Sequence, residues 1–190
     1  MNSNKLLLIL TPQNDFIDGE DCIIGAKDIM DSIARLIDKH GQGYSDIAIT
    51  MLEQPITLCF YKGEKPINCL RYSQGAAVYQ PIMQSICNLI SKNNNIHVSF
   101  FETRQSSTRD ESAFFSVIRN KYLFLDLIKR RDIQQIDIVG VGGDECINIS
   151  IDMIETGLQE KLNIIEDLCS SSDDGTKLHN FILRNSLKKY

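Results

Sequence analysis

The stretch that decides the fold is Ile136–Val141 (IDIVGV), which runs directly into Gly142–Cys146 (GGDEC). The first segment is almost continuously apolar, as expected for a strand that is covered on both faces. The glycines that follow favour a turn, and after them three isoleucines share one face of a helix: Ile147, Ile151 and Ile154. The stretch therefore predicts a buried strand that turns directly into a helix, with Cys146 in the first helical turn.

The same alternation of strand and helix continues through the rest of the chain. Other apolar segments of strand length are Lys5–Leu10, Asp46–Met51, Ile96–Phe101 and Leu162–Ile165. Segments with helical periodicity lie between or after them: Ala26–Lys39, Ile82–Ser91, Ser112–Lys129 and Lys177–Leu187. This alternation is typical of parallel strands joined by crossover helices. We therefore predict a single α/β domain over residues 1–190, doubly wound, with a mostly parallel sheet of five to six strands and helices on both faces.

Composition excludes several classes of protein. The chain has 190 residues, of which 43% are hydrophobic and 24% charged, so it can bury a core. Its 20 basic and 25 acidic residues give a net charge of -5, which offers no general attraction for nucleic acid. The early apolar run Leu6–Leu10 is far shorter than the roughly 20 residues of a membrane span, and too short for the apolar h-region of a signal peptide. We expect a cytoplasmic protein with neither nucleic acid nor a membrane as its partner.

The cysteines and histidines do not form a recognisable metal site. The six cysteines include no C-x-x-C pair, and without an export signal we expect them to be free thiols in a reducing compartment. The three histidines are too far apart in sequence to share one helical face. We therefore predict no metal and no cofactor.

Ligands of open parallel sheets bind beyond the carboxyl ends of the strands. Four segments should converge there: Thr11–Phe16, Leu52–Gln54, Phe101–Glu102 and Gly142–Cys146. The long loop-rich segment 52–77 starts at the same edge, and long loops in such folds usually carry ligand contacts.

Cys146 is the residue most suggestive of chemistry. It follows Gly142 and Gly143 at a helix start, where free N–H groups and the helix dipole lower a thiol pKa and can hold an oxyanion. These are the conditions that a cysteine nucleophile needs. The alternative is a buried structural cysteine, which is the commoner role for a single cysteine in such a turn.

Several segments of the chain, taken in sequence order, resemble those of the isochorismatase-like and nicotinamidase-like cysteine hydrolases. Leu7–Phe16 (LLILTPQNDF) is similar to their opening strand, a hydrophobic run followed by Asp, any residue and Gln-Asn-Asp-Phe. Val139–Ile147 (VGVGGDECI) is similar to their nucleophile turn, in which Gly, small residues, Asp, any residue and Cys-Val recur. Asp110–Phe115 and Arg71–Ala76 stand in the places of an Asp-Ser-Tyr-Ser-Ala-Phe stretch and a glycine-containing loop. The resemblance spans nearly the whole chain and implies a three-layer hydrolase scaffold that is commonly a homo-oligomer.

The resemblance also implies catalytic positions, and most of them are changed. In the family an Asp acts as base toward the Cys, and a Lys ends the third strand. Here Thr11 stands at the Asp position and Phe101, or at best Glu102, at the Lys position; Cys146 alone matches. A threonine hydroxyl is not a base near neutral pH, and a phenyl ring carries no charge.

The metal positions of the nicotinamidase branch are changed as well. That branch holds a metal with Asp-x-His and a further His. The corresponding residues here are Leu52–Gln54 (LEQ) and Asn68, which do not form a ligand set.

Five residues could replace the missing groups. Asp15 has an acidic counterpart in the family that usually fixes the loop, and Arg104 could return a cation from the loop after the third strand. Three glutamates are close in sequence to the expected pocket: Glu53, Glu102 and Glu145.

Three functions follow from this pattern. The first is a catalytically impaired or non-catalytic relative of the hydrolases that binds a small molecule or a protein. The alternative is an active cysteine hydrolase that cleaves an amide C–N bond through an acyl-enzyme at Cys146, with substitute acid and base residues. A third is a redox sensor, which needs a second thiol within a Cα separation of roughly 7 Å of Cys146, and for which Cys22 and Cys69 are the candidates.

Overall fold

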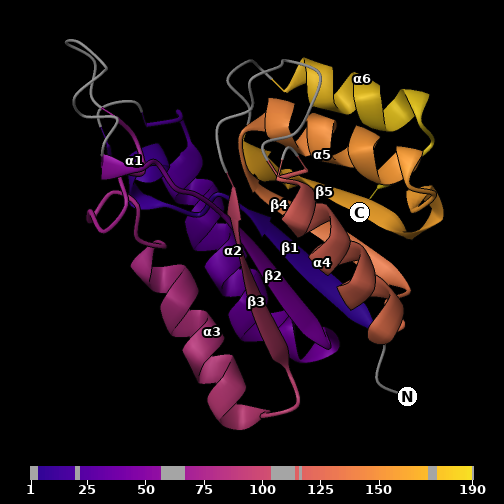
Figure 1. Cartoon of the computed structure of the whole chain (residues 1–190), viewed down its shortest axis with the longest axis horizontal. Helices are drawn as coiled ribbons and strands as arrows, with labels where there is room; N and C mark the ends of the chain where they lie inside the picture. The colour runs from indigo at the N-terminus through magenta and orange to yellow at the C-terminus, as the bar shows by residue number, and fades with distance from the viewer. Residues whose placement is uncertain are drawn as a thin grey trace.

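A computed structural model describes residues 4–19, 22–56, 67–103, 114–115, 117–170 and 175–189. Its centre is one sheet with strand order β3-β2-β1-β4-β5-β6, in which every neighbouring pair is parallel (Figure 1). The strands are β1 (Lys5–Leu10), β2 (Asp46–Leu52), β3 (His97–Thr103), β4 (Gln135–Val141), β5 (Leu162–Ser170) and β6 (Lys188–Lys189). This confirms the prediction of a doubly wound α/β fold with a parallel sheet of five to six strands.

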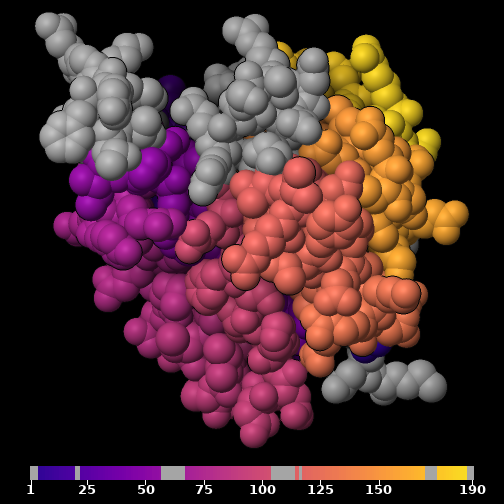
Figure 2. All heavy atoms as spheres, viewed as in Figure 1, coloured from indigo at the N-terminus to yellow at the C-terminus, as the bar shows by residue number. Residues whose placement is uncertain are grey.

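Helices cover both faces of this sheet. They are α1 (Asn14–Ile17), α2 (Ala26–His40), α3 (Gln80–Lys92), α4 (Ile118–Arg130), α5 (Gly143–Glu155) and α6 (Thr176–Arg184), with short 3-10 turns at Gly41–Gly43 and Gln159–Lys161. Figure 2, seen from the same side as Figure 1, shows α4 in salmon covering the part of the sheet behind it. Among the described residues, no helix combines the length and the apolar character that crossing a bilayer requires.

Strand β1 shows why the chain folds in three layers. Leu6, Leu8 and Leu10 belong to a core with residues of α4, α5 and α6, whereas Leu7 and Ile9 belong to a second core with residues of α2 and α3. All five are fully buried, so this strand is apolar at successive positions instead of alternating. The strand thus separates the two cores and places its last residue at the edge where the loops gather.

Gly140 allows β4 to lie very close to β1. It pairs with Leu10 and has a φ of 139°, a conformation that disfavours any side chain. A Cβ at this position would lie 2.4 Å from the Leu10 carbonyl oxygen. The glycine therefore brings the start of α5 beside the end of β1.

Three boundaries differ from the sequence prediction. Strand β5 was expected to end at Ile165 but continues to Ser170, because its register with β4 shifts between Ile138 and Gly140 and pairing then resumes at Cys169. The last helix ends at Arg184, before its expected end at Leu187, and strand β6 follows. Helix α4 begins at Ile118, later than the expected start at Ser112: Phe114 and Phe115 lie in a turn and Val117 caps the helix, while Ser112 itself lies outside the described residues.

Candidate functional site

Thr11 joins the ends of two central strands. It follows β1 with a φ of 42°, a conformation that costs a β-branched residue about 1–3 kcal/mol. Its N–H donates to Thr50 Oγ1 at 3.1 Å, and its hydroxyl donates to the Val141 carbonyl oxygen at 3.2 Å. The hydroxyl proton is therefore committed to a backbone oxygen, and the residue at the family's base position acts here as a link between β1 and β4.

Gln13 holds three segments together at this edge. Its side chain is fully buried, and its Nε2 donates to the carbonyl oxygens of Leu52 and Ala76, each at 2.8 Å. Its Oε1 accepts the Leu52 N–H at 2.6 Å. The segments predicted to meet from Thr11–Phe16 and Leu52–Gln54 are thus in direct contact, through a residue for which the sequence suggested no such role.

Asp15 fixes the loop that contains Arg71–Ala76, the segment that stands in the place of the family's glycine-containing loop. Its Oδ2 accepts the Cys69 N–H at 2.6 Å, and its own N–H donates to the Gly75 carbonyl oxygen at 3.0 Å. A Cβ on Gly75 would lie 2.0 Å from Asp15 Oδ1, so the carboxylate occupies the space that only a glycine leaves. Burial, followed by the charge of Asp15, raises the pKa of the Cys69 thiol to about 12. These contacts give Asp15 a structural role in the loop.

Phe101 belongs to the hydrophobic core. Strand β3 continues to Thr103, so Phe101 lies within the strand and not at its end as the sequence suggested. Its ring packs edge-on against Phe114 and Phe124, with centroids 5.3 and 5.9 Å away, and Phe115 completes the cluster. The side chain is 6% exposed. An aromatic cluster therefore fills the family's lysine position.

Cys146 is buried in the same core. Gly142, with a φ of 93°, precedes α5, Gly143 is its buried first residue, and the Cys146 N–H donates to the Gly142 carbonyl oxygen at 3.0 Å. The amide nearest the thiol is thus already used within the helix. The residue is 0% exposed.

The pKa of the Cys146 thiol is raised well above its usual value, contrary to the lowering expected from its place at a helix start. The largest cause is the interaction with the neighbouring Cys169 thiol, followed by burial. The half-buried Glu145 adds a like charge that acts in the same direction. These effects outweigh the helix terminus, so the thiol stays protonated near neutral pH.

Cys169 is the partner that the sequence interpretation missed. It stands opposite Gly140 on β5, and its Sγ lies 3.7 Å from the Ile138 carbonyl oxygen. Cys22 is exposed, and Cys69 contacts the Asp15 loop. Cys169 was overlooked because the predicted strand ended at Ile165, before the register shift that returns β5 to the sheet.

A cluster of charges lies at the carboxyl ends of β2 and β3. Arg71 Nε is 2.6 Å from Glu53 Oε2, and Arg71 Nη2 is 3.1 Å from Glu102 Oε2. Asn120, from α4, donates to the Glu102 carbonyl oxygen at 2.6 Å. These residues line a cavity of about 370 Å³ together with Phe101 and Thr103. Both glutamates were among the residues that the sequence analysis placed near the pocket, but their pairing with Arg71 was not predicted. The other candidate cation, Arg104, lies outside the described residues.

The residues at the family's metal positions do not fit a metal ion. Glu53 is paired with Arg71, and the backbone of Gln54 exchanges hydrogen bonds with Cys69 and Arg71. Across the described ranges, no three His, Cys, Asp or Glu side chains come close enough together to hold a metal. The positive charge at this edge comes from the guanidinium of Arg71.

Comparison with solved structures identifies the fold. The pyrazinamidase/nicotinamidase from Streptococcus mutans matches with a TM-score of 0.75 and 18% identity over 98% of this chain and 100% of that chain. The yeast nicotinamidase bound to nicotinaldehyde matches with a TM-score of 0.71 and 16% identity over 97% and 98%. N-carbamoylsarcosine amidase from Thermoplasma acidophilum matches with a TM-score of 0.66 and 10% identity over 98% and 95%.

No protein-family model matches the sequence, and no curated protein matches it significantly. The structural matches show that the chain has the fold of the isochorismatase-like cysteine hydrolases, as its resembling segments predicted.

Proposed function

We propose that this chain is a hydrolase scaffold without hydrolytic activity, which binds a small polar molecule at the carboxyl edge of its sheet. The observation that carries the proposal is the state of Cys146: a fully buried thiol whose pKa is raised by the neighbouring Cys169 thiol and by burial.

Acyl transfer to a cysteine needs a thiolate and a base within hydrogen-bond reach. Thr11, at the family's base position, supplies no base, because its hydroxyl donates to the Val141 carbonyl oxygen. Phe101, at the cation position, carries no charge to stabilise a thiolate and packs among aromatic rings. Loss of a member of a catalytic unit costs several powers of ten in rate. Simultaneous loss at two positions supports a non-hydrolytic role.

The cavity beside Arg71 supports a small molecule as the ligand. Its volume of about 370 Å³ falls within the range of small-molecule sites. The cavity is concave, unlike a typical protein-binding surface. Arg71, Glu53 and Glu102 line it with both signs of charge, so a polar molecule can exchange its own groups for the existing ion pairs. A homo-oligomer stays a prediction from the family resemblance.

The alternative function, an amide hydrolase with substitute acid and base groups, finds less support. Asp15 is bound to the Cys69 amide and Glu53 to Arg71, and Glu145 raises the pKa of the thiol further. A substitute base would have to act on a thiol that is not exposed.

A turnover assay separates the two functions. Purified protein and a Cys146→Ala variant are incubated with nicotinamide, pyrazinamide and N-carbamoylsarcosine, and released ammonia is measured. We expect equal background rates for both proteins. Turnover by the wild type that disappears in Cys146→Ala would overturn the proposal in favour of the hydrolase.

The Cys146–Cys169 contact favours one further candidate function, a peroxide-oxidised dithiol. The Cys146 thiolate would attack a peroxide oxygen and release hydroxide, giving a sulfenic acid, and the Cys169 thiol would then displace water. In sum, two thiols and one hydrogen peroxide give one disulfide and two waters. Burial and the raised pKa of Cys146 make this reaction slow. Peptide mapping after peroxide treatment tests it: a Cys146–Cys169 disulfide supports the dithiol function, and Cys146 oxidised singly or left unmodified excludes it.

A further inference from the structure

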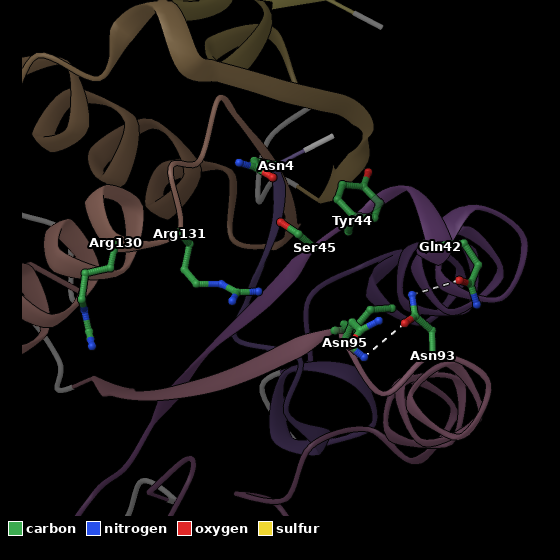
Figure 3. A pocket seen from close by; sticks show the side chains of 9 residues that line it. Asn4, Gln42, Tyr44, Ser45, Asn93, Asn95, Arg130 and Arg131 are labelled. Carbon is green, nitrogen blue, oxygen red and sulfur yellow. Dashed lines mark hydrogen bonds between the residues drawn. The ribbon is translucent and has the colours of Figure 1, made fainter. Parts of the chain in front are cut away.

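A second polar cavity lies at the opposite edge of the sheet, where the strands begin. It has a volume of about 370 Å³ and is lined by residues that precede β1, β2 and β3 and by the end of α4 (Figure 3). Its lining includes two arginines, Arg130 and Arg131, and several side-chain amides, but no carboxylate. Although the chain as a whole carries a net charge of -5, this lining is locally positive and therefore favours an anion.

Arg131 is held in place by a buried carboxylate. Its Nε donates to Asp46 Oδ1 at 3.0 Å, and the Asp46 side chain is 1% exposed. The other oxygen, Asp46 Oδ2, accepts the Ser45 hydroxyl at 2.7 Å. Asp46 thus orients the guanidinium through Nε.

The outer nitrogens of Arg131 are available to a ligand. The side chain is 40% exposed, and neither Nη nitrogen makes a hydrogen bond to another of the described residues. A guanidinium presents its paired N–H groups in a geometry that matches the two oxygens of a carboxylate or phosphate. Arg130 is more exposed and pairs with Asp126 at 2.6 Å, so it contributes mainly to the potential.

Side-chain amides form the facing wall. Asn93 Nδ2 donates to Gln42 Oε1 at 3.2 Å, and Asn93 Oδ1 accepts the Asn95 N–H at 3.1 Å. Figure 3 shows these residues across the cavity from Arg131. The Asn95 side-chain amide lies on the Arg131 side of Asn93 and remains as a donor for a ligand there, whereas Gln42 lies beyond Asn93 (Figure 3).

We propose that this cavity binds a small hydrophilic oxyanion, a carboxylate or a phosphate group, with Arg131 as its main contact and the side-chain amide of Asn95 as a supporting donor. The site lies at the opposite edge of the sheet from Cys146 and Arg71. It therefore stands or falls independently of the proposed function.

An NMR titration tests this site with two probes, inorganic phosphate and succinate, each added at constant ionic strength against sodium chloride. We expect saturable shifts of the side-chain amide of Asn95. Saturation by phosphate alone assigns a phosphate site, by succinate alone a carboxylate site, and by both a general oxyanion site. If neither probe saturates, the proposal is wrong.

Arg131→Lys is the decisive variant, because a lysine keeps a positive charge beside the buried Asp46 but loses the paired N–H groups. We expect its dissociation constant to rise about tenfold or more. Arg35→Gln, on the exposed face of α2, and Cys146→Ala should bind as the wild type does. Undiminished binding by folded Arg131→Lys would overturn the assignment, and so would equal loss in Arg35→Gln.

Discussion

Phe101→Lys returns the family's residue to its position in the third strand and should strongly destabilise this protein. The Phe101 side chain is 6% exposed and packs edge-on against Phe114 and Phe124. Removing a buried phenyl ring costs about 3–5 kcal/mol. A lysine here would also have to bury an ammonium or give up its proton, so we expect a total loss of about 4 kcal/mol or more. That is a large part of the 5–15 kcal/mol of a typical domain.

The assay is urea unfolding followed by circular dichroism, since the chain has no tryptophan. Phe100→Lys is the matched control: its side chain is 50% exposed on the same strand, so the loss should stay below about 1 kcal/mol. The pKa of a buried lysine is lowered on folding, so the unfolded chain binds more protons and Phe101→Lys should become more stable as pH rises from 6 to 10. Losses within 1 kcal/mol of each other for the two variants would refute the view that aromatic packing has replaced the cationic position.

Three further predictions concern the framework. Gly140→Ala should cost about 2 kcal/mol or more in urea unfolding, because its Cβ would meet the Leu10 backbone, whereas Gly43→Ala, with open space around it, should be nearly neutral; equal effects would contradict the close approach of β4 to β1. Burial and a hydrogen bond to Asp137 raise the pKa of Tyr44, so the folded state keeps this proton longer than the unfolded chain and stability should fall as pH rises above about 10. Tyr44→Phe should lose that part of the alkaline slope in thermal unfolding, and an unchanged slope would count against it. Asp15→Asn weakens a charged hydrogen bond to Cys69 and should cost about 1–3 kcal/mol and speed proteolysis near the loop, whereas exposed Asp18→Asn should do neither.

The central strands could be predicted from the sequence because burial on both faces leaves a direct trace in it. Leu6–Leu10 is apolar at every position, and each side chain is fully buried in one of the two cores. The glycines after β4 likewise marked the turn into α5, where the structure has Gly142 at a positive φ. Such local signals identify elements and their order.

The state of the site depends on contacts between distant residues, which local patterns do not record. Cys169 reaches Cys146 because of a register shift between β4 and β5. Arg71 meets glutamates that are 18 and 31 residues away in sequence. A helix start alone suggested a lowered thiol pKa, but the second thiol and complete burial have the opposite effect. The residue types at the site could therefore be predicted, but their protonation and access could not.

The most direct test is the pH dependence of Cys146 alkylation by iodoacetamide in the native protein, quantified by mass spectrometry with exposed Cys22 as the internal standard. We predict that Cys146 stays unmodified through pH 9 while Cys22 reacts fully, and that both react after unfolding. Rapid alkylation of native Cys146 at pH 6–7, faster than that of Cys22, would show an activated thiolate and contradict the account.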